Sequence, residues 1–144
     1  MSEPIHIGIT GTRYGGTEYQ LLKCAKILSE KFIPGSEFHH GDCVGIDQQV
    51  ARIARKIGYV IVCHPPIKEE HRAFEPADVM LDAANHFARN RNIVKSVDLL
   101  LVCPVTNEWQ PRGGTWYTHD FAKKMGRDLV LITPEPQKTR VQPR

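Results

Sequence analysis

The segment 111–122, PRGGTWYTHDFA, places an arginine, two glycines and a threonine just before a stretch with helical character. Glycines let the backbone approach a ligand closely because no Cβ intervenes, and the N–H groups that begin a helix favour an anion. The hydroxyl of Thr115 can donate to a phosphate oxygen or cap the helix. The pattern therefore fits a phosphate-binding turn at Gly113, Gly114 and Thr115, or a plain strand-to-helix turn.

A second glycine turn follows the first apolar run, in GITGTRYGGT. Gly11, Thr12 and Arg13 offer backbone amides, a hydroxyl and a guanidinium that can form paired hydrogen bonds to phosphate. The spacing is not G-x-G-x-x-G, so the dinucleotide-binding fingerprint is absent. The alternative interpretation is an exposed arginine on a connecting loop.

A third turn, HGDCVGID, brings two glycines and two aspartates next to a histidine. Gly41 and Gly45 flank Asp42, and we expect His40 to lie at the rim of a ligand site. Asp47 falls in the first turn of an expected helix, where it can bind ribose hydroxyls. It can equally stabilise the helix dipole by about 0.3–1 kcal/mol.

Polar residues also interrupt the helical stretch ARNRNIV. Arg89, Asn90 and Arg91 are adjacent, so they cannot share one helix face and at most two of them reach a common site. The alternative is a solvated basic face.

Histidines and cysteines gather in two short strips, 39–43 and 63–64. Zinc sites normally show repeated ligand pairs and a closed set of four ligands, which these strips lack. Adjacent His39 and His40 would also point to opposite faces of a strand. We therefore expect no metal and no cofactor. No C-x-x-C pair occurs, so reduced thiols are expected at Cys24, Cys43, Cys63 and Cys103.

Alternating strands and helices must position these turns. Short β-branched runs predict five strands, and helical spacing of apolar residues predicts four helices. The expected strands are 4–10, 36–41, 59–65, 97–104 and 128–134, and the expected helices are 17–32, 45–58, 80–97 and 113–126. Segment 67–77 is expected to be an irregular loop or lid. The alternation predicts one Rossmann-like α/β domain, a parallel five-stranded sheet with helices on both faces.

The carboxyl ends of parallel strands lie at one edge of the sheet, and ligands bind there near the point where strand order reverses. The three glycine turns follow the first, second and fourth expected strands. The sequence therefore predicts that they converge on one rim.

The composition suits a small globular protein. With 144 residues, one domain is expected over 1–134, followed by a flexible tail over 135–144. No apolar run approaches the roughly 20 residues of a membrane span, and the N-terminus lacks signal-peptide features. We therefore expect a cytoplasmic protein that contacts no membrane. A net charge of +3 suits small anions and does not favour nucleic acid.

The order of the motifs IGITGTR, HGDCVGID, RNRNIVKSVDLLLV and RGGTWYTHDFAKKMGRDLVLI resembles the SLOG superfamily of Rossmann-like domains. This superfamily includes the Smf/DprA and Lonely Guy proteins, and the resemblance is closest to small stand-alone YspA-like members. It implies a nucleotide-derived ligand and, because related domains often pair through helices, a homodimer or higher homo-oligomer. The implied ligand-binding positions are Gly11, Thr12, Arg13, Gly41, Asp42, Gly45, Asp47, Arg89, Asn90, Arg91, Gly113, Gly114 and Thr115.

One position departs from the Lonely Guy hydrolases, which resemble P-G-G-x-G-T-x-x-E. Thr118 stands where their glutamate assists N-glycosidic cleavage, and a threonine cannot act as a carboxylate. Thr118 is therefore expected to contact the ligand without cleaving it. The resemblance then implies binding of a phosphorylated ribose ligand, such as an ADP-ribose-like, NAD-derived or cyclic nucleotide. The alternative is a nucleotide N-glycosidase in which Asp47, Glu108 or Asp120 is the acid and Arg91 holds the phosphate.

Overall fold

The computed structural model describes residues 3–137, which form one α/β domain. Within them, six parallel strands make one sheet in the order β4-β3-β2-β1-β5-β6, so the strand order reverses between β1 and β5. The strands are β1 (His6–Gly11), β2 (Glu37–His40), β3 (Val60–Cys63), β4 (Val79–Met80), β5 (Leu99–Cys103) and β6 (Asp128–Leu131). The Rossmann-like class predicted from the sequence is confirmed.

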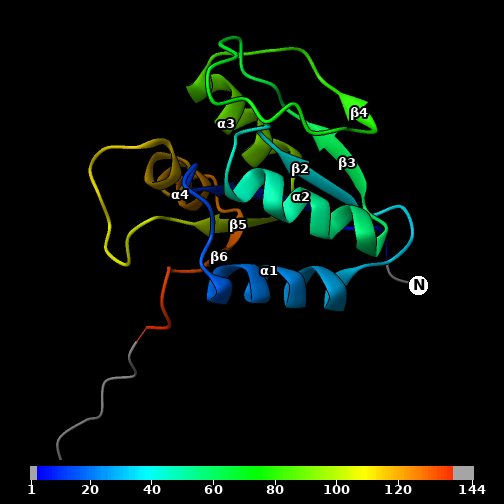
Figure 1. The fold of residues 1–144 in the computed structure, drawn as a ribbon, viewed down its shortest axis with the longest axis horizontal. Helices are drawn as coiled ribbons and strands as arrows, with labels where there is room; N and C mark the ends of the chain where they lie inside the picture. The colour runs from blue at the N-terminus through cyan, green and yellow to red at the C-terminus, as the bar shows by residue number, and fades with distance from the viewer. Residues whose placement is uncertain (1–2, 138–144) are drawn as a thin grey trace, which may run out of the picture.

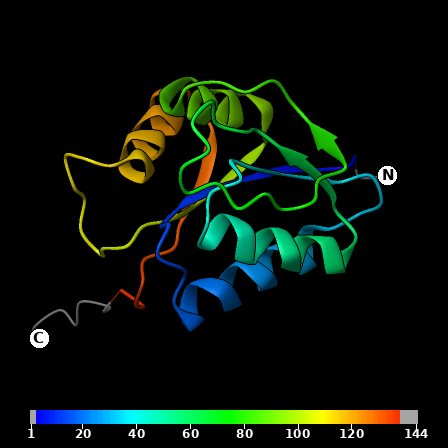
Figure 2. The same ribbon diagram turned by 45° about the horizontal axis from the view of Figure 1, so that its top comes forward.

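Helices cover both faces of the sheet (Figures 1 and 2). The pair α1 (Glu18–Lys31) and α2 (Ile46–Ile57) lies on one face, and the pair α3 (His86–Ser96) and α4 (Gly114–Lys124) lies on the other. Strand β5 is buried throughout: Leu101 packs into the core under α1 and α2, whereas Leu100 and Val102 pack with α3 and α4. A strand that is buried on both faces has a continuous apolar sequence, and β5 has one.

The prediction of five strands is wrong, because β4 adds a sixth at the sheet edge. Its two residues, Val79 and Met80, pair with β3 and are exposed, so they carry no alternating apolar pattern. The expected helix 80–97 also begins later, at His86. Asn85 ends the preceding loop there, and its side-chain oxygen accepts the backbone N–H of Ala88 at 2.9 Å.

The described residues 3–137 contain no helix that is long and apolar enough to cross a membrane. All four cysteines lie within this part of the chain, and all are free thiols, as expected. Residues 138–144 of the expected tail lie outside the described residues. The division into a domain and a tail therefore stays a prediction.

Candidate functional site

The three glycine turns meet at one cavity of about 1030 Å³ at the carboxyl ends of the strands. This is the rim predicted from the strand order. Ten of the expected ligand-binding residues line the cavity: Gly11, Thr12, Arg13, Gly41, Asp47, Arg89, Asn90, Gly113, Gly114 and Thr115. The other five, His40, Asp42, Gly45, Arg91 and Thr118, do not line it.

The start of α4 faces this cavity without a side-chain cap. The N-cap residue is Gly113, not Thr115, and its φ of 107° is one that glycine adopts readily. Apart from Gly113 itself and its two chain neighbours, no heavy atom of residues 3–137 lies within 4 Å of where a Cβ on Gly113 would be. The first N–H groups of a helix have no partners within the helix, so an uncapped start beside a cavity suits an anion. The alternative of a threonine cap is not what the structure shows.

Arg89 reaches the cavity and also holds its wall. Its buried guanidinium donates to the carbonyl of Gly41, to Asn90 Oδ1 at 2.8 Å and to His86 Nδ1 at 3.1 Å. Burial and the adjacent Arg89 lower the pKa of His86. Arg91 points elsewhere and donates to the hydroxyl of Tyr117 at 3.0 Å. Of the two arginines of this helix that the resemblance implied, Arg89 therefore lines the cavity and Arg91 does not.

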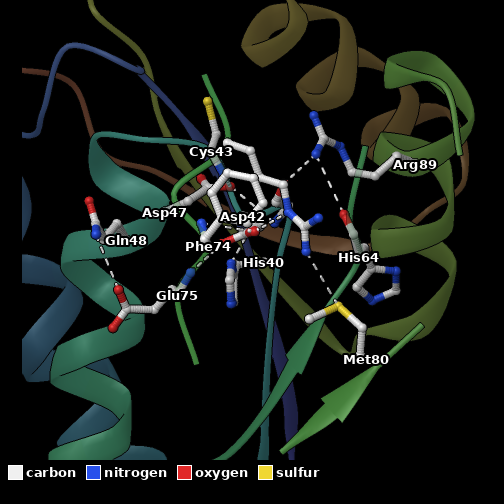
Figure 3. A network of polar contacts seen from close by, with 12 residues as sticks. His40, Asp42, Cys43, Asp47, Gln48, His64, Phe74, Glu75, Met80 and Arg89 are labelled. Atoms are coloured by element: carbon white, nitrogen blue, oxygen red, sulfur yellow. Dashed lines mark hydrogen bonds and ion pairs between the residues drawn. The ribbon is translucent and has the colours of Figure 1, made fainter. Parts of the chain in front are cut away.

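Asp42 fastens the loop 67–77 instead of facing the cavity (Figure 3). One carboxylate oxygen accepts the guanidinium of Arg72 at 2.6 Å and the backbone N–H of Phe74 at 3.2 Å. The other oxygen accepts the N–H of Glu75 at 3.0 Å. The backbone N–H of Asp42 donates to His40 Nδ1 at 2.9 Å, and burial lowers the pKa of His40 to about 4.

Gly45 joins the first and third turns to each other. A Cβ at Gly45 would lie 2.5 Å from the carbonyl carbon of Arg13 and 2.6 Å from the carbonyl oxygen of Thr12. The next residue, Ile46, donates its backbone N–H to Thr12 at 3.0 Å. The space beside Gly45 is therefore filled by the protein's own backbone.

Asp47 is the acidic residue of the third turn that does line the cavity. Its carboxylate accepts the backbone N–H groups of Gly41 at 3.0 Å and Cys43 at 3.5 Å. Burial raises the pKa of Asp47 to about 6, and the positive charge of Arg89 opposes this shift. A carboxyl with this pKa can hold or release a proton near neutral pH.

The other expected acids lie away from the cavity. Glu108 is exposed and does not line it. Asp120 accepts from Trp109 Nε1 at 3.0 Å and pairs with His119 Nδ1 at 2.9 Å, and this pairing lowers its pKa. Thr118 is buried and donates its hydroxyl to the carbonyl of Gly114 at 2.6 Å, within its own helix.

Two exposed aromatic residues at the cavity were not predicted from the sequence. Tyr14 is 75% exposed and accepts a hydrogen bond from Arg13 at 3.0 Å. Phe87 is 56% exposed and packs edge-on against Tyr117, with ring centroids 4.7 Å apart. The sequence signal for these two residues is an apolar side chain in an otherwise polar stretch. A single such residue shows no periodicity, so the pattern does not predict its role.

No protein-family model matches the sequence, and no curated protein matches it. Solved structures do match. The molybdenum cofactor binding protein of Rippkaea orientalis is 20% identical with a TM-score of 0.69, over 92% of this chain and 78% of that one. The molybdenum cofactor carrier protein of Chlamydomonas reinhardtii is 18% identical with a TM-score of 0.64, over 91% and 78%.

DNA processing protein A of Helicobacter pylori, described with a single-stranded DNA binding mode, is 18% identical with a TM-score of 0.65. The match covers 94% of this chain and 66% of that one. This chain shares the Rossmann-like fold of these proteins. At such low identities the similarity establishes the fold alone. The chemistry of the cavity is the basis for proposing a ligand.

Proposed function

We propose that this SLOG-type domain binds a phosphorylated ribose ligand, such as ADP-ribose or another NAD-derived or cyclic nucleotide. The observation that carries the proposal is the uncapped start of α4, which opens into the cavity beside Gly113, Gly114 and Thr115. Helix N-termini of this kind bind phosphate through backbone N–H groups and the helix dipole.

The remainder of the cavity suits the other parts of a nucleotide. The guanidinium groups of Arg13, Arg89 and Arg112 line it, and they supply positive charge for a second phosphate. Tyr14 and Phe87 expose flat aromatic rings on which a base can stack. A cavity of about 1030 Å³ lies at the upper end of typical ligand pockets, which span about 300–1,000 Å³.

The matched structures support a phosphate-bearing ligand. Two of them are named for the molybdenum cofactor and one for single-stranded DNA, and both of these ligands carry phosphate. The net charge of +3 gives little support to DNA as the ligand here. The binding experiment therefore includes a short oligonucleotide beside the small nucleotides, which distinguishes a nucleic-acid phosphate from that of a free nucleotide.

Calorimetric titration with ADP-ribose, NAD⁺, AMP, cyclic AMP and a short single-stranded oligonucleotide tests the proposal. We expect one of the nucleotides to bind in a one-to-one ratio. Gly113→Asp places a carboxylate where the phosphate would lie, and we expect it to weaken binding more than about tenfold. Absence of binding by every nucleotide would refute the proposal, and binding of the oligonucleotide alone would replace it.

Gly126→Asp is a matched control for the Gly113 variant. Gly126 also has a positive φ, of 71°. Apart from Gly126 itself and its two chain neighbours, no heavy atom of residues 3–137 lies within 4 Å of where a Cβ on Gly126 would be. It lies beyond the other end of α4 and does not line the cavity. The control should therefore bind the nucleotide as the wild type does.

The position of Asp47 favours a second candidate function, the nucleotide N-glycosidase. Of the three acids expected for this role, it alone lines the cavity within the described residues, and its pKa is about 6. Incubation with nucleoside monophosphates, followed by chromatography for free base, tests this activity. Base release that Asp47→Asn abolishes would favour the enzyme. Nucleotide binding without base release would favour the binding protein.

A further inference from the structure

A second group of ligand-type side chains lies on the sheet away from the cavity. His6 and Glu37 are register partners at the starts of β1 and β2, and His39 follows two residues after Glu37. Residues two apart in a strand share a face, so all three side chains stand on the same face of the sheet. The cavity lies at the opposite ends of these strands, so this cluster is separate from the proposed nucleotide site.

The three side chains converge on one point. His6 Nδ1 lies 2.9 Å and His39 Nε2 lies 2.8 Å from the same oxygen, Glu37 Oε1. The donor atoms all lie within 4.8 Å of one another. Around tetrahedral Zn²⁺, nitrogen and oxygen ligands at about 2.0–2.2 Å from the metal are about 3.3 Å apart. Small side-chain movements therefore suffice to admit an ion, and we propose that His6, Glu37 and His39 bind a divalent transition metal, with zinc as the reference ion.

The surroundings of His39 provide the outer hydrogen bond that zinc ligands use. His39 Nδ1 lies 2.8 Å from His64 Nε2. A metal-bound histidine normally donates its other N–H group to a nearby acceptor, which fixes its tautomer. His64 Nε2 is the atom placed to accept this N–H group.

Charge and exposure agree with a bound cation. Asp98 adds a second carboxylate, which accepts the backbone N–H of His6 at 2.9 Å. The side chains of His6 and Glu37 are 40% and 31% exposed, whereas that of His39 is 5% exposed. An ion can therefore enter from solvent at the His6 side and keep water as its fourth ligand, as open zinc sites do.

A buried cluster of His40, Asp42 and Cys63 offers a similar set of residue types but a poorer site. Both carboxylate oxygens of Asp42 already accept hydrogen bonds from the loop 67–77. His40 Nδ1 accepts the backbone N–H of Asp42. His40 Nε2 has no hydrogen-bond partner among the described residues, but the carboxylate of Asp42 is already used to hold the loop 67–77, so the exposed cluster is the better metal site.

Titration with Co²⁺, followed by competition with Zn²⁺, tests the proposed site. Visible absorption of Co²⁺ reports ligand geometry, so tetrahedral binding gives bands that aqueous Co²⁺ lacks. We expect one equivalent to bind, and His6→Ala and Glu37→Gln each to weaken Zn²⁺ affinity more than about 100-fold, beyond the effect of losing an outer-shell partner. Equal affinity in the wild type and His6→Ala would overturn the proposal, as would the absence of cobalt bands.

Asp120→Asn is the matched control for Glu37→Gln. Asp120 also pairs with a histidine, His119 at 2.9 Å, but this pair has no second histidine that converges on the same oxygen. The control should keep the zinc affinity of the wild type. Circular dichroism of each variant verifies folding, and His6→Ala decides the outcome if Glu37→Gln is misfolded, because the His6 side chain is the most exposed of the three.

Discussion

The turns that begin α2 and α4 look alike in sequence but differ in what surrounds them. Each helix starts at a glycine with a positive φ, 96° at Gly45 and 107° at Gly113, and neither has a side-chain cap in the described residues. Beside Gly45 lies the backbone of Thr12 and Arg13, whereas the space beside Gly113 is open. One turn is completed by the protein itself, and the other is left available for a ligand.

This difference separates structural glycine motifs from binding motifs. Both turns let another backbone segment or a ligand approach the main chain closely, because neither glycine carries a Cβ. At Gly45 the neighbour is the first glycine turn, which accepts the N–H of Ile46. At Gly113 the neighbour must be a ligand or water. The third turn therefore shapes the cavity, and the turn before α4 leaves its backbone N–H groups available for the proposed ligand.

Among substitutions in the third turn, HGDCVGID, Asp42→Ala is expected to have the largest effect on stability. The substitution leaves the guanidinium of Arg72 and the N–H groups of Phe74 and Glu75 without their shared acceptor. Removing one partner of a buried ion pair costs about 3–5 kcal/mol. We expect a loss of this size in the free energy of unfolding, measured by urea denaturation. Asp120→Ala, at an exposed carboxylate, should change it by less than about 0.5 kcal/mol.

Gly45→Ala and Gly113→Ala test the comparison directly. Both variants place a Cβ on a backbone conformation that is favourable only for glycine, which costs about 1–3 kcal/mol. Only Gly45→Ala also forces a Cβ against backbone, and such overpacking costs about 1–3 kcal/mol more. Thermal or urea unfolding should therefore rank Gly45→Ala as the less stable of the two. Equal stabilities would show that the two turns are not different in packing.

The sequence predicted the alternation of strands and helices well, because the apolar periods of β1 and α2 are regular and β5 is a continuous apolar run. It also placed ten of the fifteen expected binding residues around one cavity. It could not choose between Arg89 and Arg91, since that choice depends on how α3 rotates against the sheet. It missed the role of Asp42 because its partners, 72–75, are distant in sequence and lie in an irregular loop.

The smallest expected effect concerns Asp47, the acidic residue of the third turn that lines the cavity. The pKa of Asp47 is raised from 3.8 to about 6 by folding. Between these pH values its carboxyl is therefore more protonated in the folded protein than in the unfolded chain. Its contribution therefore lowers stability as the pH rises through this window. Above pH 6 its negative charge also opposes an anion in the cavity.

Affinity for ADP-ribose, whose pyrophosphate stays ionised from pH 5 to pH 7.5, should fall across this range. A unit charge about 10 Å away contributes about 1.7 kcal/mol at an effective dielectric constant of about 20, so a decrease of roughly tenfold is expected. Asp47→Asn removes this charge and should flatten the profile. His86 also lines the cavity, and loss of its imidazolium charge as the pH rises weakens the binding of an anion in the same direction. The difference between the wild type and Asp47→Asn therefore isolates the carboxylate, and parallel profiles would show that Asp47 acts only in the packing of its turn.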